Sequence, residues 1–302
     1  MSSISIIINT KDSAETLKRA LGSVKWADEC IVVDMKSSDN TVEIAEKFGA
    51  KVFAHADVGY VEPARNFAVS KATSDWVLVL DADEEVPETL HTYIQQKILD
   101  QNPEFVAVAL PRKNMIFSRW MQHTGWWPDY QIRLFKKGAV TWSEKIHKQP
   151  EVQGDVTELP PKEELAILHH HYTSVEQFIG RLNNYTAFQA NSEAESTVTA
   201  ESLINRFSSQ LFSRLFVQDG LKDGLHGLST SFLQAMYELT VEMKKWEKQG
   251  FKDEYASPKK TLAALSTMKN GMEYWIADWH VHHTQGLEQL YWRFQRKRHT
   301  LQ

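Results

Sequence analysis

The sequence predicts an α/β fold in which a mostly parallel sheet, flanked by helices, is followed by a helical C-terminal region. In about the first 110 residues, short β-branched runs alternate with amphipathic runs, which is the pattern of βαβ units. From Ser174 onward, apolar residues recur at helical spacing. The chain has 302 residues, 42% hydrophobic and 24% charged, so it can bury a large core and is neither disordered nor a disulfide-stapled mini-protein.

Each predicted element follows from the spacing of apolar residues and from the residues at its ends. Strands are expected at residues 5–8, 30–33, 51–53, 76–80 and 105–110. Helices are expected between them at residues 14–24, 41–48, 62–72 and 87–99, with Gly49 ending the second and Pro87 in the first turn of the last. In the C-terminal region, Ser174 and Gln177 form a capping pair, and further helices cover residues 229–249 and follow Pro258.

Charge and cysteine content narrow the class of protein. With 34 basic and 39 acidic residues the net charge is -5, which disfavours a nucleic-acid partner. The single cysteine, Cys30, lies in an apolar run and is interpreted as a small buried residue in a reducing compartment. The N-terminus lacks signal-peptide features, and no run approaches the roughly 20 apolar residues that span a bilayer. We therefore expect a cytoplasmic protein.

Polar residues end three of the predicted parallel strands, where ligands of such sheets bind. Thr10 and Asp34 follow the first two strands, and Asp81 and Asp83 follow the strand at 76–80. Paired carboxylates suit Mg²⁺ or Mn²⁺ holding a diphosphate, although they also suit an acidic turn before the next helix. Asp34 can accept a hydrogen bond from a base or a ribose, or cap a helix.

Several well-known motifs are absent from the sequence. It contains no G-x-G-x-x-G, Walker A, H-E-x-x-H or G-x-S-x-G segment. This disfavours a dinucleotide enzyme, a P-loop NTPase, a zincin and an α/β-hydrolase. A nucleotidyltransferase is also disfavoured, because residues 9–12 lack the glycine-rich loop it would need after the first strand.

An ordered set of segments carries a family resemblance. It comprises residues 6–10, 31–41, 64–66 and 80–84, then 125–135, Trp142, 146–148 and the H-x-x-Y of 169–172. Together they resemble family 2 glycosyltransferases, which have the GT-A fold, and the later segments are similar to a branch that includes bacterial lipopolysaccharide-core β-glucosyltransferases. The resemblance implies a GT-A domain at residues 1–172 and a helical region at 173–302.

The resemblance assigns the donor side of the site residue by residue. Thr10 and Asp34 would contact the nucleoside, and Arg65 would face the nucleotide or its diphosphate. Asp81 and Asp83 would hold the Mn²⁺ or Mg²⁺ ion and the donor, a UDP-sugar that is expected to carry glucose. The sequence departs from the family at Met35-Lys36, which replace an Asp/Ser-Gly pair, and Lys36 reaches either a phosphate or water.

The acceptor side is assigned in the same way. Asp129 matches the family's acceptor base, with Glu144 as a rival. Trp126, Trp127 and His147 are expected to contact the acceptor, although both tryptophans can instead pack in the core and His147 can instead bind a metal or be structural. The acceptor is expected to be a glycan or a lipid-linked sugar such as lipopolysaccharide core.

Three further features of the sequence each allow two interpretations. Arg133 either contacts a phosphate or forms a buried pair with Asp129. Of the three consecutive histidines at 169–171, one member, His169 or His171, is expected to point inward. The apolar stripe of residues 203–216 either packs inside the protein or, with Arg206 and Arg214, contacts anionic lipid.

The sequence therefore predicts a metal-dependent, inverting glycosyltransferase, cytoplasmic or peripheral on the inner face of the membrane. The alternative is a non-catalytic module that binds a nucleotide-sugar or glycan on the same fold, and the Met35-Lys36 departure supports it. The oligomeric state is not predicted.

Overall fold

The computed structural model describes residues 2–57, 62–101, 103–143, 150–193, 196–252 and 257–299. The chain forms two compact units, one of residues 1–115 with 126–171 and one of residues 116–125 with 172–302. The second unit thus includes residues 116–125, which the sequence analysis assigned to the N-terminal domain.

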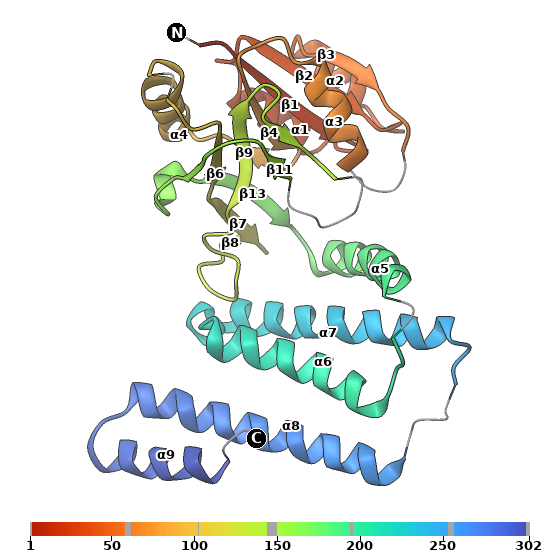
Figure 1. Cartoon of the computed structure of the whole chain (residues 1–302), viewed down its shortest axis with the longest axis vertical. Coiled ribbons are helices and arrows are strands. Elements are labelled where there is room, and N and C mark those ends of the chain that lie inside the picture. The colour runs from red at the N-terminus through yellow and green to blue at the C-terminus, as the bar shows by residue number, and fades with distance from the viewer. Residues whose placement is uncertain are drawn as a thin grey trace. The chain divides into compact units, whose positions relative to one another are not determined.

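The first unit alternates strands and helices as predicted (Figure 1). Its elements are β1 (Ile4–Thr10), α1 (Leu17–Ser23), β2 (Glu29–Asp34), α2 (Thr41–Lys47), β3 (Lys51–Ala54), α3 (Glu62–Lys71), β4 (Trp76–Asp81), β5 (Glu84–Glu85), α4 (Glu88–Tyr93), η1 (Ile94–Leu99), β6 (Ala107–Leu110), β7 (Arg112–Ile116), β9 (Gln131–Lys136), β10 (Val140–Thr141), β11 (Glu151–Val152), β12 (Val156–Glu158), η2 (Glu163–Leu165) and β13 (Ile167–Tyr172).

The main sheet has the strand order β12-β6-β9-β4-β1-β2-β3. Strand β1 pairs in parallel with β2 and β4, and β2 pairs in parallel with β3. Strand β9 runs antiparallel to both of its neighbours, β4 and β6. The sheet is therefore mostly parallel, and the one reversed strand enters next to the strand that ends in Asp81. In a smaller sheet, β13 lies between β5 and β7.

Both faces of the main sheet are covered, because alternate side chains of a strand point to opposite faces. On one face Ile4, Ile6 and Ile8 pack in a cluster with residues of α1, α2 and η1. On the other face Ile7 packs with Val79 and with residues of α3. Strands that are apolar on both faces are typical of parallel sheets between two helical layers, which explains the near-continuous apolar runs.

The differences from the predicted elements are local. Pro87 lies before α4 as its N-cap residue rather than inside the first turn, and the helix ends as a π-helical turn, η1. Gly49 has φ +79, as expected after the end of α2. Cys30 is partly buried, and burial, together with the charge of Glu29, raises the pKa of its thiol to about 12, so it stays protonated at neutral pH.

The second unit is mainly helical. Its elements are β8 (Arg119–Trp120), α5 (Val175–Ser192), α6 (Ala200–Phe212), η3 (Ser213–Val217), η4 (Gly220–Asp223), α7 (Gly224–Lys248), α8 (Pro258–His283) and α9 (Gly286–Arg298). Ser174 accepts a hydrogen bond from the Gln177 N–H at the start of α5, as the capping pair predicts. The segment after Pro258, expected as one helix, forms two, α8 and α9.

The apolar stripe predicted at residues 203–216 lies on α6 and η3 and packs inside this unit. Leu211, Phe212 and Leu215 are buried against α7 and α8. Arg206 forms ion pairs with glutamates of α7 and with Glu193. The packing interpretation of this stripe therefore describes it, whereas a lipid contact would require the same face to be exposed. Among the described residues, no helix has the length and apolarity to cross a bilayer.

Glu29 joins three strands at the amino edge of the main sheet. Its carboxylate accepts hydrogen bonds from Ser5 Oγ at 2.6 Å, Lys51 Nζ at 2.7 Å and the Thr73 N–H at 2.9 Å. Burial alone would raise the pKa of Glu29, but the hydrogen bonds outweigh it and lower the pKa from 4.5 to about 2. The stabilisation is thus complete above pH 4.5 and is lost as the pH falls through about 2.

We expect Glu29→Gln to lower the free energy of unfolding by about 1–3 kcal/mol at neutral pH, because buried donors lose a charged acceptor. The difference from wild type should shrink as the pH falls from about 5 toward 2. Urea denaturation across this range measures it. Glu43→Gln, which removes the exposed pair with Lys47, is the control and should have little effect, because exposed ion pairs contribute little to stability. A pH-independent difference at Glu29 would contradict this account.

Candidate active site

Three parallel strands end side by side at the carboxyl edge of the main sheet. Thr10 pairs in register with Asp34, and Asn9 pairs with Asp81. Asn9, Thr10 and Asp34 are buried, yet the Asn9 side-chain amide, Thr10 Oγ1 and Asp34 Oδ1 have no hydrogen-bond partner among the described residues. Because buried polar atoms are normally paired, this edge has the character of a site for a polar ligand.

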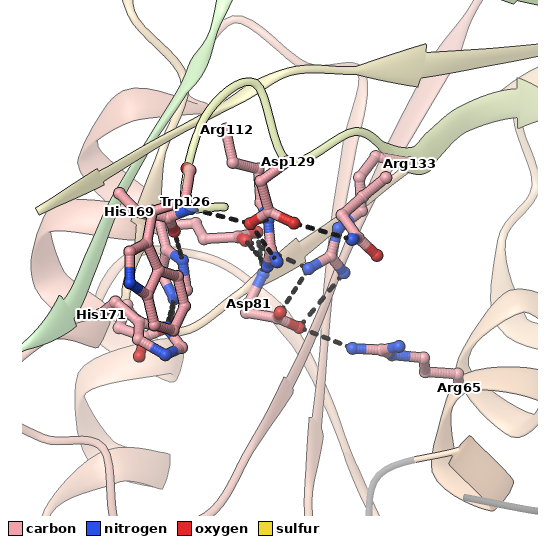
Figure 2. Close-up of polar contacts among 12 residues, drawn as sticks. Arg65, Asp81, Arg112, Trp126, Asp129, Arg133, His169 and His171 are labelled. Atoms are coloured by element: carbon pink, nitrogen blue, oxygen red, sulfur yellow. Dashed lines mark hydrogen bonds and ion pairs between the residues drawn. The ribbon is translucent and has the colours of Figure 1, made fainter. Parts of the chain in front are cut away.

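Asp81, the last residue of β4, lies between two arginines (Figure 2). Arg65 of α3 places Nη2 3.0 Å from Asp81 Oδ1. Arg133 of β9 binds both carboxylate oxygens, Nη1 lying 3.3 Å from Oδ1 and Nη2 contacting Oδ2. The same Arg133 Nη2 lies 3.1 Å from Oε1 of Glu84, which is fully buried. The Asp81 carboxylate is thus fixed in place by charges from two other elements.

Burial alone would raise the pKa of the Asp81 carboxyl, but the charges of Arg133 and Arg65 outweigh it and hold the pKa well below its ordinary value. Burial alone would lower the pKa of Arg133, but Asp81 and Glu84 outweigh it and raise the pKa. Asp81 therefore stays ionised throughout the neutral range and keeps its negative charge at the sheet edge.

Asp129 lies in a second part of the same charge network. Arg112 of β7 donates from Nε at 3.0 Å and from Nη2 at 2.7 Å to Asp129 Oδ2, and Asn114 Nδ2 donates to the same oxygen at 2.8 Å. The other oxygen, Oδ1, accepts from Gln131 Nε2 at 3.3 Å. Arg112 Nη1 also lies 3.2 Å from Glu84 Oε1. Glu84 therefore connects the Asp81 and Asp129 parts through two arginines.

Asp83 faces the histidines of β13. His169 Nε2 lies 3.6 Å from Asp83 Oδ1 and 3.0 Å from His171 Nδ1, and His169 Nδ1 lies 2.6 Å from Asn114 Oδ1. His169 is buried at 4% exposure, so it is the inward-pointing member of the three histidines. The His171 ring lies 5.2 Å from the Trp126 ring (Figure 2).

A carboxylate and an imidazole this close suit a divalent cation chemically. Within the described part of the chain, no three His, Cys, Asp or Glu side chains are grouped as a ready-made metal site. Asp83 and His169 could supply protein ligands to an ion that takes its remaining ligands from a bound diphosphate and water, as Mg²⁺ does.

The structure brings most of the predicted site residues together. The donor-side residues Thr10, Asp34, Arg65 and Asp81 lie at one sheet edge. Arg133 forms its buried pairs with Asp81 and Glu84 rather than with Asp129. His147 and Glu144 lie outside the described residues.

The predicted roles of Trp126, Trp127 and Lys36 are met only in part by where the structure places these residues. Trp126 and Trp127 are both half-buried, and the Trp126 carbonyl accepts a hydrogen bond from Asn114 at 2.7 Å, so part of Trp126 serves the structure. Lys36 is exposed and has φ +62, a conformation that favours glycine. Lys36 therefore has the backbone conformation that suits the glycine usual at this place in the family.

The sequence analysis missed Glu84, Arg112 and Asn114. Glu84 directly follows the paired aspartates, and Arg112 and Asn114 alternate along β7 just after a predicted strand. Side chains two apart on a strand share a face, so this alternation was a usable signal. Their partners, however, come from residues 126–133 and from β13, and no local pattern identifies those.

Comparison with known proteins identifies the family of this chain. Residues 5–149 match the model of glycosyl transferase family 2. An uncharacterized glycosyltransferase of Rickettsia typhi is 35% identical over 200 residues, 63% of this chain and 68% of that protein. The lipopolysaccharide core biosynthesis glycosyltransferase LpsC of Rhizobium meliloti is 22% identical over 256 residues, 78% of this chain and 89% of that protein.

Among solved structures, Mycobacterium tuberculosis glucosyl-3-phosphoglycerate synthase in complex with Mn²⁺ and UDP-glucose aligns at a TM-score of 0.31 and 20% identity, over 37% of this chain and 43% of that one. On the family model and the Rickettsia relative, the chain belongs to family 2 of the glycosyltransferases, the enzymes that move a sugar from a donor to an acceptor.

We expect Arg133→Met to destabilise the protein by about 3–5 kcal/mol at neutral pH, because it leaves the fully buried Glu84 carboxylate beside the partly buried Asp81 carboxylate with fewer positive charges. Without Arg133, burial should raise the pKa of Asp81, so the loss should shrink as the pH is lowered. Chemical denaturation at several pH values measures both effects.

The matched control is Arg19→Met. Arg19 forms a half-exposed pair with Glu85 at 3.7 Å, and its loss should cost less than about 1 kcal/mol. Equal costs for the two variants would show that Arg133 does not organise the site.

Proposed function

We propose that this protein transfers a hexose, glucose, with inversion from a UDP-sugar to a glycan or lipid-linked acceptor such as lipopolysaccharide core, and that Mn²⁺ or Mg²⁺ assists. The observation that carries the proposal is the pairing of two sites in one unit. Buried polar atoms of Asn9, Thr10 and Asp34, which have no hydrogen-bond partner within the described part of the chain, lie at the carboxyl edge of the sheet. Asp129 presents a fixed carboxylate that is connected to this edge through Glu84.

On the donor side, Thr10 and Asp34 would bind the nucleoside. Asp34 Oδ2 already accepts the Ser37 N–H at 3.1 Å, which holds the carboxylate so that Oδ1 can accept from a base N–H or a ribose hydroxyl. Arg65 Nε is buried and has no partner among the described residues. It would donate to a phosphate while Nη2 stays bound to Asp81.

The paired aspartates would divide their roles. Both oxygens of Asp81 are bound by arginines, so we assign Asp81 to orienting Arg65 and the donor. Asp83, with His169 beside it, would hold the divalent cation. The bound ion would neutralise the charge that develops on the departing diphosphate.

On the acceptor side, Asp129 would be the base. Three donors fix its Oδ2 atom, whereas Oδ1 accepts one hydrogen bond from the described residues, at 3.3 Å. We therefore assign Oδ1 as the atom that takes the proton of the acceptor hydroxyl as it attacks the anomeric carbon. A single displacement by this hydroxyl inverts the sugar, which gives a β-linkage from an α-linked UDP-sugar. Trp126 would offer a ring to the acceptor sugar.

The acceptor class rests on the relative LpsC, whose name assigns it to lipopolysaccharide core biosynthesis and which matches 78% of this chain at 22% identity. We accordingly place the protein in the cytoplasm or at the inner face of the membrane, where UDP-sugars are available. The non-catalytic alternative would bind the donor without turnover.

The first experiment is a thermal-shift screen of UDP- and GDP-sugars with and without Mn²⁺, followed by donor turnover. A donor that binds the native state raises the apparent melting temperature by mass action, and UDP-glucose should give the largest shift. Stabilisation without any turnover, in the presence of core oligosaccharide acceptors, would favour the binding-module alternative.

We expect Asp129→Asn to reduce kcat by about 10²–10⁴-fold, because the amide cannot accept the acceptor proton. The UDP-sugar dissociation constant should change little, since the donor residues are intact. Calorimetric titration and steady-state kinetics separate the two effects. Asp100→Asn, a change at an exposed carboxylate after η1, is the control, and unchanged kcat in Asp129→Asn would reassign the base.

We expect Asp83→Asn to abolish the dependence of UDP binding on Mn²⁺, because the carboxylate that would hold the ion is lost. In wild type, EDTA should weaken UDP binding and Mn²⁺ should restore it. The neighbouring change Glu85→Gln, at a carboxylate paired with His170, should retain the Mn²⁺ effect. Equal Mn²⁺ responses of the wild-type and Asp83→Asn proteins would remove Asp83 from the metal site.

A further inference from the structure

The helix α9 presents its apolar side to solvent. Leu287, Leu290, Tyr291 and Phe294 are 86%, 57%, 54% and 65% exposed. Their spacing of i, i+3, i+4 and i+7 puts them in one stripe along the helix. A helix of a soluble domain normally turns such a stripe toward the core, so the orientation of α9 calls for a physical cause.

The cause is that the opposite, polar side of α9 is bound to α8. Arg296 Nη1 lies 2.7 Å from Asp278 Oδ1, and Gln289 Nε2 donates to the Val281 carbonyl at 2.9 Å. The Trp292 ring stacks on His280 with centroids 4.0 Å apart. Figure 1 shows the two helices side by side as a hairpin.

A further contact joins the C-terminal end of α9 to α8. The His299 Nδ1 atom lies 3.0 Å from Glu273 Oε2. These contacts occupy successive turns of α9, so they fix its rotation about its own axis. The apolar stripe is therefore exposed because these contacts fix the rotation of α9 on α8.

The charge around the stripe indicates what covers it. The helix carries one acidic residue, Glu288, and four basic ones, Arg293, Arg296, Lys297 and Arg298. Of these, Arg293, Lys297 and Arg298 are exposed. The segment is therefore net positive on a chain whose net charge is -5. An apolar stripe edged by arginine and lysine is the composition of helices that lie in the interface of an anionic bilayer.

We infer that α9 is a membrane-docking helix, which inserts Leu287, Leu290, Tyr291 and Phe294 into the surface of a bilayer that contains anionic lipid. The exposed arginines meet the headgroups, each adding to the attraction. A second copy of the chain is a poorer occupant, because two such helices would bring their basic residues together. This inference goes beyond the proposed sugar transfer and does not depend on it.

The test measures binding of the full-length protein to phosphatidylcholine vesicles with and without phosphatidylglycerol, by co-sedimentation at low and high salt. Wild type should bind the anionic vesicles and lose most of that binding in high salt. Leu290→Gln with Phe294→Gln should weaken binding at least ten-fold. Leu225→Gln with Phe232→Gln, at exposed apolar residues of α7, should bind as wild type does.

The charge contribution has its own pair of variants. Arg293→Gln with Arg298→Gln should weaken binding to anionic vesicles by about five-fold for each charge removed. Lys259→Gln with Lys260→Gln, at exposed lysines at the start of α8, is the matched control and should have a smaller effect. Equal effects of the two pairs would show only general electrostatic attraction and would overturn the assignment to α9.

Insertion is measured directly with a fluorophore. Leu287→Cys labelled with an environment-sensitive dye should shift its emission to the blue on anionic vesicles, and labelled Leu225→Cys should not. The native thiol, Cys30, is partly buried with a pKa of about 12, so it competes little for the label. The inference is overturned if wild type ignores anionic vesicles, or if light scattering shows a dimer that Leu290→Gln with Phe294→Gln dissociates.

Discussion

The Arg133 guanidinium, buried between the carboxylates of Asp81 and Glu84, is the interaction on which the site depends. It lies on β9, the strand that reverses direction in an otherwise mostly parallel region. A buried arginine is stable only when its charge is matched and its donors are used. Its planar fork can serve two carboxylates at once, which a lysine cannot do with the same geometry. The antiparallel insertion of β9 thus brings the positive charge that keeps Asp81 ionised at the end of β4.

From Asp81 and Glu84 the network of alternating charges extends toward the proposed donor side and the proposed acceptor side. Arg65 lies beyond Asp81, and Arg112 connects Glu84 to Asp129. The relative position of the donor edge and the proposed base is therefore set by ion pairs of low exposure rather than by a direct contact between them. Asp129 itself has φ +44, a left-handed conformation that aspartate tolerates better than most residues. The bonds from Arg112 and Asn114 hold the side chain of a residue whose backbone is already unusual, which is a common arrangement where a side chain must be aimed.

Much of the fold could be predicted, because buried parallel strands and their helices leave periodic patterns in the sequence. The strands ending at Thr10, Asp34 and Asp81 were predicted from such runs, and the carboxyl edge follows from parallel topology alone. The partner of Arg133 could not be predicted, since it depends on where β9 enters the sheet. Arg112 and Asn114 were missed for the same reason, because their contacts with Asp129 and His169 depend on how distant segments pair with β7. Segment 203–216 shows the limit most clearly: its pattern favours packing but also fits a lipid contact, and the observed burial of Leu211 and Leu215 decides between the two.

Helix α9 is a second case in which the sequence pattern alone does not decide whether an apolar stripe is buried. Its pattern predicts burial of the Leu287 stripe, yet Arg296 and Trp292 are the residues that pack on α8. Exposed apolar area has a cost in water, about 25 cal/mol for each Å², so the polar contacts must retain an orientation that solvent disfavours. A bilayer removes that cost, because the same stripe then leaves water. If the acceptor is lipid-linked, as we propose, it is confined to the membrane surface, and an enzyme held at that surface meets it at a raised effective concentration. The orientation that is unfavourable in solution would then be the one that brings enzyme and acceptor together.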